Sequence, residues 1–303
     1  MNLTKDKENR CCHVFRRGLH EFYCCGARVR IIDGKIEVLT NPQVTYCPLH
    51  EMLYGTQKID KKAVEQSVKM KIETFGFCCE NRIFDDSMIV PYGSSEIIRV
   101  CMEQNFLDCA VIVCEGAGTV ITANPSLVQA IGARLTGIIK TSPIKGIIEH
   151  IKDKNGIVLD EKSARIDQVG GILKAADLGY KRIAVTVASF MSKSMEKIRK
   201  IDKEKKIRVA IFSVCNTCAD NEDVERILSH ADIVCASASK LIREKVGPKA
   251  LMQLGVTIPV FALTEFGKNL ILAYLEKFKD KLVIFRTNKL PYQVEGKGPK
   301  LEG

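Results

Sequence analysis

Tryptophan is absent from this chain of 303 residues, and so are long apolar runs. The longest apolar stretches cover a few residues, such as AVIV at 110–113, whereas a helix that crosses a bilayer needs about 20. The first ten residues, MNLTKDKENR, are charged and lack the apolar core of a secretory signal. These absences predict a cytoplasmic protein without a membrane partner.

A complete catalytic motif is also absent. None of the five histidines falls at the end of a predicted strand of the main sheet, so a triad with a histidine base is not expected. The net charge is +10, but its densest basic segment, 193–208, has interspersed acids and is typical of a solvated helix face. Nucleic acid is therefore not an expected partner, and whether the protein is an enzyme stays open.

From residue 94 onward, short apolar strands alternate with amphipathic helices, a pattern that predicts βαβ units. Strands are expected at 107–115, 136–141, 181–189, 207–214, 231–238, 258–263 and 281–287. Helices are expected at 94–106, 124–135, 142–154, 164–180, 194–204, 221–230, 240–255 and 264–278. The predicted fold class is α/β, with a mainly parallel sheet covered by helices on both faces. We divide the chain into a Cys-rich N-terminal module (1–93), an α/β domain (94–287) and a flexible tail (288–303).

The N-terminal module contains a predicted hairpin. ARVRIIDGKIEVLT (27–40) alternates apolar and polar residues around Asp33-Gly34, a strong hairpin signal. A two-residue turn there pairs Ile32 with Lys35 and Val29 with Val38. Extending this register places several cysteines and one histidine near its open end. The residues are His20, Cys24, Cys25 and Cys47, with Cys11, Cys12 and His13 close enough in sequence to fold back onto them.

Thirteen cysteines are many for a cytoplasmic chain, and several occur as adjacent pairs. In a reducing compartment they are thiols or ligands rather than disulfides. Cys24, Cys25 and Cys47, followed by Cys78 and His20, are candidate ligands of an iron–sulfur cluster or zinc. Adjacent residues of a strand point to opposite faces, so one of each pair is expected to face such a site. Burial as small apolar side chains and a reactive thiol remain open.

Two further motifs follow predicted strands. Cys215 and Cys218 form a C-x2-C before a helix, where the helix terminus lowers the pKa of a thiol. This spacing suits a redox pair or half of a metal site, with a structural role equally open. Gly116 and Gly118 have the placement of a phosphate-binding loop, but the β-branched TVITA that follows favours a tight turn into a strand.

Polar residues gather at the predicted strand ends, which in an open parallel sheet form the ligand crevice. In CASASKLIR, Ser237, Ser239 and Lys240 precede a helix and suit an anion. Each single serine is also explained as a helix cap. Together they predict a crevice for a small anionic ligand.

Several strings resemble the methanogenesis marker protein 8 family of methanogenic archaea. They are HEFYCCGARVRIIDGKIEV, YCPL, FGFC, AVIVCEGAGTVI, ARIDQVGG, GYKRIAVTVA and ADIVCASASK, spread over about 13–275. The resemblance implies an anaerobic cytoplasm and a role in methanogenesis, such as maturation or activation of methyl-coenzyme M reductase or its cofactors. That enzyme or its maturation proteins are the implied partners. The resemblance implies no reaction and no catalytic residue.

Three hypotheses of different classes follow, the third being a pure interaction protein, a chaperone-like adaptor that binds a partner through its basic face. In the first, the chain is a methanogenesis accessory protein whose N-terminal cysteines bind a cluster or another metal. In the second, it is an enzyme that acts on a small anionic metabolite in the strand-end crevice, and the cysteines are structural.

Overall fold

The computed structural model describes residues 18–88, 90–132 and 137–301. Its main sheet has eight strands, and the four central ones are parallel to one another. In spatial order the strands are β12 (Met252–Leu254), β13 (Val260–Ala262), β11 (Ile233–Cys235), β10 (Arg208–Val214), β9 (Arg182–Ala188), β5 (Cys109–Cys114), β6 (Gly118–Thr122) and β8 (Ile157–Val158). The outer strands β12, β13, β6 and β8 pair antiparallel. The sheet is thus mixed, less parallel than the sequence predicted.

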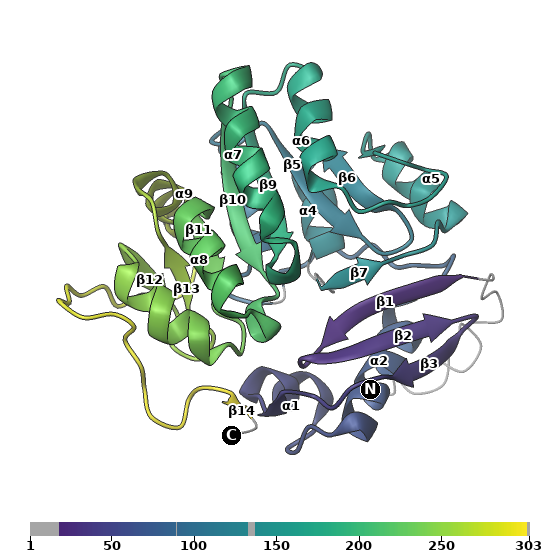
Figure 1. The fold of residues 1–303 in the computed structure, drawn as a ribbon, viewed down its shortest axis with the longest axis horizontal. Coiled ribbons are helices and arrows are strands. Elements are labelled where there is room, and N and C mark those ends of the chain that lie inside the picture. The colour runs from purple at the N-terminus through teal and green to yellow at the C-terminus, as the bar shows by residue number, and fades with distance from the viewer. Residues whose placement is uncertain (1–17, 89, 133–136, 302–303) are drawn as a thin grey trace.

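Helices cover both faces of this sheet, which confirms the α/β expectation. One face carries α6 (Gln168–Asp177), α7 (Lys193–Lys205) and α8 (Asn221–His230), packed side by side (Figure 1). The other face carries α3 (Ser94–Glu103), α4 (Pro125–Gly132) and α9 (Glu265–Glu276). Successive residues of β5 join different hydrophobic clusters, Cys109 and Val111 on one face and Ala110 and Ile112 on the other. Burial on both faces explains why the strands are continuous apolar runs.

A second, antiparallel sheet holds most of the N-terminal module. Its order is β3 (Lys35–Val38), β2 (Ala27–Ile32), β1 (Leu19–Cys24) and β7 (Ile138–Lys140). The predicted register of β2 and β3 is confirmed, because Ile32 pairs with Lys35 and Val29 with Val38. The strand expected at 136–141 is present, but it pairs with β1 instead of joining the main sheet. One strand from beyond the proposed division at residue 93, β7, therefore belongs to the sheet of the N-terminal module.

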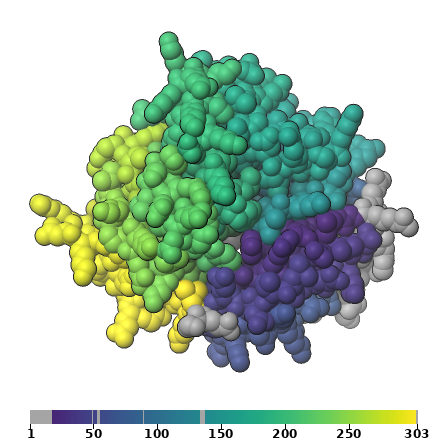
Figure 2. All heavy atoms as spheres, viewed as in Figure 1, coloured from purple at the N-terminus to yellow at the C-terminus, as the bar shows by residue number. Residues whose placement is uncertain are grey.

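The remaining helices and turns lie between these strands and helices along the chain. They are α1 (Pro48–Tyr54), α2 (Lys61–Phe75), α5 (Lys145–Asp153), and the short helical turns Ser189–Met191, Asn216–Cys218, Ile242–Val246 and Gly247–Lys249. β4 (Val44–Tyr46) pairs with β14 (Lys300–Leu301), so the C-terminal residues return to the N-terminal module. Figure 2 shows the N-terminal residues (purple) packed against the teal and green surface of the α/β part, with the C-terminal segment (yellow) at one corner.

Two predicted elements are wrong. The helix expected at 240–255 breaks after Val246, because Gly247 and Pro248 form a tighter turn and proline cannot continue a helix ladder. The strand expected at 281–287 is not a strand in the described chain. Among the described residues, no strand pairs with this segment. Its side chains face solvent, and Val283 is 89% exposed. Apolar content alone predicted this strand, and pairing partners decide whether one forms.

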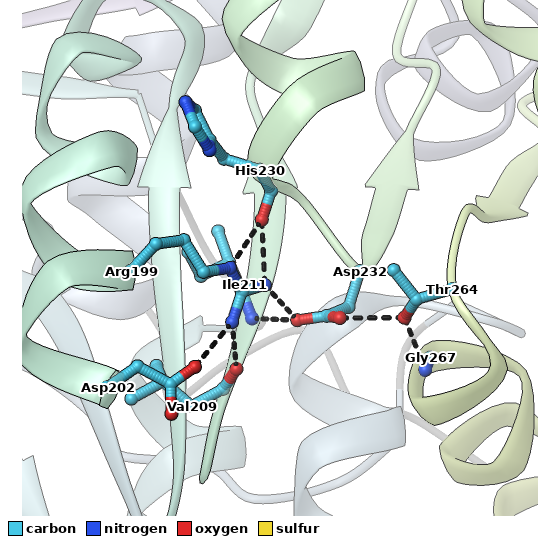
Figure 3. Close-up of polar contacts among 8 residues, drawn as sticks. All are labelled: Arg199, Asp202, Val209, Ile211, His230, Asp232, Thr264 and Gly267. Atoms are coloured by element: carbon cyan, nitrogen blue, oxygen red, sulfur yellow. Dashed lines mark hydrogen bonds and ion pairs between the residues drawn. The ribbon is translucent and has the colours of Figure 1, made fainter. Parts of the chain in front are cut away.

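A buried polar cluster fixes the amino end of the parallel strands (Figure 3). Arg199 of α7 donates to Asp232 at 2.5 Å and to the carbonyl of His230. The Asp232 carboxylate also accepts from the amide of Ile211 at 2.9 Å and from the hydroxyl of Thr264 at 2.7 Å. This cluster joins α7, β10, β11 and α9 with its charges paired, so we assign it a structural role. The candidate site lies at the opposite end of the strands.

Candidate functional site

The carboxyl ends of the parallel strands are covered by the N-terminal sheet (Figure 1). The ring of Tyr23 in β1 lies 5.6 Å from that of Phe190, just after β9. The Tyr23 amide donates to the carbonyl of Gly137 at 2.9 Å. Cys218, in the turn after β10, places its thiol 3.6 Å from the carbonyl oxygen of Gly26. The crevice expected at this edge is therefore closed over by β1 and the turn that follows it.

That turn is formed by Cys25 and Gly26, which have φ of 52° and 77°. Two positive φ angles between paired strands define a type I′ hairpin turn, usually built from Asn-Gly. A side chain on Gly26 would place its Cβ 2.8 Å from the Cβ of Gln43, so only glycine fits there. The carbonyl of Cys25 accepts hydrogen bonds from the amides of Gln43 and Val44. A cysteine in left-handed backbone destabilises the fold by about 1 kcal/mol or more. This strained residue lies beside the carboxyl ends of the parallel strands.

The left-handed backbone brings the two adjacent thiols together. A hydrogen bond with the Cys25 thiol lowers the pKa of Cys24 to about 5, and the charge of Lys71 and the Ser67 hydroxyl, 3.7 Å away, also favour the thiolate. The pKa of Cys25 is raised, because that thiol keeps the shared proton. Cys47, the N-cap of α1, lies close enough to Cys25 to interact electrostatically. The expectation that adjacent cysteines face opposite sides is wrong for this pair. We call Cys24, Cys25 and Cys47 the hairpin thiols.

The other two predicted ligands lie elsewhere. His20 is buried, with its Nδ1 2.7 Å from the hydroxyl of Thr141, and burial lowers its pKa to about 4. Cys78 is buried near Glu115 and Cys114, and burial raises its pKa. The five predicted ligands thus occupy three places. Cys11, Cys12 and His13 lie outside the described residues, and within the described ones no group of three or more His, Cys, Asp or Glu is arranged to hold a metal ion.

A cavity of about 170 Å³ opens at the carboxyl ends of the four parallel strands, between the sheet and the start of α3. We call it the strand-end cavity. Its apolar walls include Ile98, Ile112, Val113, Val128 and Val214, and its polar lining comprises Ser94, Ser95, Glu96, Thr186, Cys215, Cys235 and Ser237. The Glu96 carboxylate accepts hydrogen bonds from Ser95 and Gln129. The cavity therefore offers hydroxyls and two thiols against a mostly apolar wall.

Two residues of this lining have left-handed backbone, Cys215 with φ of 52° and Ser237 with φ of 51°. The two turns that contain them are hydrogen-bonded together. The amide of Asn216 donates to the Ser237 hydroxyl at 3.1 Å, and its side-chain amide donates to the Cys235 carbonyl at 2.7 Å. Such backbone persists only where the surroundings hold it in place, and it clusters at ligand sites.

The predicted ligand-binding residues are only partly brought together. Ser237 lines the cavity. Ser239 instead accepts from the amide of Ile242, and the side chain of Lys240 is 75% exposed beside Glu244. Gly116 and Gly118 lie in the β5–β6 turn, where a Cβ on Gly118 would be 2.2 Å from the carbonyl oxygen of Ala164. The close approach of neighbouring atoms explains why glycine occupies both positions. Contact of this turn with a phosphate stays a prediction.

Cys215 and Cys218 point to different neighbours. Cys215 lines the cavity, whereas the thiol of Cys218 lies against the hairpin turn. Burial raises the pKa of Cys218 to about 11, the reverse of the lowering expected from a helix terminus. Helix α8 begins beyond it, with Asp220 as the N-cap, so its amides are directed to that carboxylate.

Sequence reasoning missed Cys235 and the start of α3. Cys235 ends β11 and lies near the guanidinium of Arg243, which is also close to Cys47. Arg243 donates to the carbonyls of Ser237 and Thr257. Cys47, one of the hairpin thiols, and Cys235, in the cavity lining, therefore both lie near the Arg243 cation at the same end of the sheet. The position of Cys235 at the end of an apolar strand was visible in the sequence, but its neighbours were not.

Comparisons with known proteins place these features in a family context. A family model described as "Uncharacterized protein conserved in archaea (DUF2099)" matches residues 20–276. The chain is 40% identical over 267 residues to "Uncharacterized protein MJ0054" of Methanocaldococcus jannaschii, covering 88% of this chain and 92% of that relative. No helix among the described residues is long and apolar enough to span a membrane. The matched range contains the whole strand-end cavity and all three hairpin thiols.

Proposed function

Because the chain belongs to the archaeal family DUF2099, we propose that it is an accessory protein of archaeal metabolism that binds a small ligand in the strand-end cavity. The observation that carries this proposal is the cavity itself, at the strand ends where open α/β sheets bind ligands. The link to methanogenesis, and to methyl-coenzyme M reductase as a partner, rests on the sequence resemblance described above. The proposal is independent of that link.

The cavity limits the ligand by size and polarity. An apolar cavity of about 150 Å³ holds a benzene molecule, and the cavity of about 170 Å³ is of that order. The amino end of α3 favours an anionic group, but Glu96 lies in the same lining. The ligand is therefore a compact molecule with an apolar part and at most one anionic group.

Filling the cavity is expected to remove the ligand. In protein purified anaerobically and analysed by native mass spectrometry, we expect wild type to carry about one small molecule per chain. Val113→Phe, which adds an aromatic ring to the cavity wall, should carry none. Val283→Phe makes the same change at an exposed position and should leave the occupancy unchanged. Equal occupancy in Val113→Phe and wild type would place the ligand elsewhere.

A second candidate function is metal or cluster binding by the hairpin thiols. It is supported by the lowered pKa of Cys24, because the thiolate is the form that binds metals. The donors suit zinc or an iron–sulfur cluster, but only three of the five predicted ligands lie together. They are not arranged as a formed site in the part of the chain that the structure describes. A metal would thus need a fourth ligand and some movement of the turn.

Metal analysis tests this candidate. We expect protein prepared under strict anaerobiosis to contain zinc, or iron with acid-labile sulfide, and Cys47→Ser to lose most of it. Cys109→Ser, at a buried thiol within β5, is the matched control and should keep its metal. Full metal content in Cys47→Ser would remove that residue from the site. A metal-free wild-type protein that is still folded would end this candidate.

A further inference from the structure

We propose that Cys215 and Cys235 form a dithiol in the strand-end cavity that undergoes thiol–disulfide exchange with a small, mostly apolar disulfide. This inference deepens the function proposed above and rests on it, because it names the substrate class that the cavity takes.

The register of the sheet places the two thiols together. In the parallel pair β10–β11, Phe212 aligns with Ile233 and Ser213 with Val234. The same register aligns Val214 with Cys235 and leaves Cys215 one residue further. Neighbouring strands lie about 4.8 Å apart, and disulfides join Cα atoms about 4.4–6.8 Å apart. This register therefore places Cys215 and Cys235 at neighbouring strand ends, with a spacing of the order that a disulfide spans.

The left-handed backbone of Cys215 turns the chain so that this residue borders the same cavity as Cys235. In continued strand geometry, Cys215 would face opposite to Val214 and Cys235. With φ of 52°, the chain turns, and all three residues line the same cavity. Cys218 completes the C-x2-C motif in sequence only, because its thiol contacts the carbonyl of Gly26 and is not part of the lining. The partner of Cys215 is thus a residue on the next strand.

The surroundings assign different roles to the two thiols. Burial raises the pKa of the Cys235 thiol, so it keeps its proton at neutral pH. Arg243 interacts favourably with the negative charge of Cys235 and stabilises its thiolate when it forms. In this proposal Cys215 attacks first and Cys235 resolves the intermediate, an order that the two serine variants test. The exchange should accelerate as pH rises, because the second step requires deprotonated Cys235.

The substrate disulfide is itself the oxidant, so the reaction needs no other. The Cys215 thiolate attacks one sulfur of R–S–S–R, forming a mixed disulfide and releasing RS⁻, which takes up a proton. The Cys235 thiolate then attacks the sulfur of Cys215, releasing the second RS⁻ and closing the Cys215–Cys235 disulfide. The substrate gains two electrons and the dithiol loses two.

The probe for this reaction is bis(2-hydroxyethyl) disulfide, a small neutral disulfide, added to reduced, desalted protein under anaerobic conditions. We expect wild type to release two equivalents of 2-mercaptoethanol and peptide mapping to find Cys215 linked to Cys235. Cys235→Ser should stop at the mixed disulfide, with one equivalent released and the adduct on Cys215. Cys215→Ser should react at about one tenth of the wild-type rate or more slowly still. The matched control Cys218→Ser should behave as wild type.

Two outcomes would overturn the inference in distinguishable ways. Adducts on the hairpin thiols at the same rate as on Cys215, or unchanged reaction of Cys215→Ser, would refute the dithiol while leaving ligand binding in the cavity intact. Unchanged exchange in Val113→Phe would show that the thiols react without the cavity, which refutes the cavity as the binding site. Circular dichroism of each variant shows whether a lost reaction reflects lost folding.

Discussion

Replacing Arg82 by alanine is expected to lower the free energy of unfolding by about 3–5 kcal/mol, the usual cost of breaking a buried ion pair. The Arg82 side chain is 1% exposed and is paired with the equally buried carboxylate of Glu115. The guanidinium also donates to the carbonyls of Ile83 and Ala130 and lies 4.7 Å from the centre of the Phe84 ring. Alanine would leave the Glu115 charge buried without its cation, at the carboxyl end of β5.

Urea denaturation followed by circular dichroism measures this effect. Lys145→Ala removes an exposed pair with Glu149 on α5 and should change stability by at most about 0.5 kcal/mol. Replacing both partners, as Arg82→Met with Glu115→Leu, should recover much of the loss, because no charge is then left buried. A loss below about 1 kcal/mol in Arg82→Ala would show that water reaches Glu115 and that the pair is not buried in solution.

Acid is expected to destabilise the protein between about pH 6.5 and pH 4 through His20. Its pKa is near 6.5 in the unfolded chain and about 4 in the fold, where burial lowers it. Above pH 6.5 the ring is neutral in both states and stability is unaffected. Between these values the unfolded chain binds the extra proton, so the free energy of unfolding falls as pH falls. A difference of about 2.5 pH units corresponds to about 3 kcal/mol.

Thermal or urea unfolding as a function of pH checks this. His20→Gln stays neutral at every pH, and its amide can still bond to Thr141, so it should lose about 3 kcal/mol of the pH dependence. The remaining dependence is expected to come mainly from His50, whose pKa is also lowered to about 4 by burial and by Lys71, and in part from His150 and His230, whose pKa values are also lowered by burial. His230→Gln, at a less buried ring at the end of α8 whose pKa burial also lowers, is the comparison and should change the pH dependence less than His20→Gln does. Parallel curves for His20→Gln and wild type would contradict the assignment.

Local pattern predicted most of the α/β fold. Strands β5, β9, β10 and β11 are apolar runs between amphipathic helices, and each was expected at its observed place. The helix expected at 240–255 failed for a local reason, the Gly247-Pro248 pair, whereas the other two failures depend on partners far away in sequence. The segment 138–140 has the apolar character of a main-sheet strand, yet its pairing with Phe22 and Glu21 decides where it lies. Residues 281–287 lack any such partner in the described chain.

The candidate site was less predictable, because it depends on backbone conformations that composition does not reveal. The Asp33-Gly34 turn was recognised from its residue types, but the equivalent Cys25-Gly26 turn was not, since cysteine is unusual at positive φ. The same conformation at Cys215 sends the two members of the C-x2-C motif to different neighbours. Cys235 enters the site only through the alignment of β10 with β11.

The position of β7 has a consequence for how the chain is made. On the ribosome, β1, β2 and β3 emerge about 100 residues ahead of β7, which completes the sheet at the other edge of β1. At about 5–20 residues per second, that edge waits on the order of ten seconds with unpaired backbone groups and nascent thiols exposed. A newly made N-terminal segment is therefore most vulnerable to oxidation and mispairing during synthesis. A chaperone or a strictly reducing environment would matter more to its biogenesis than to the finished protein.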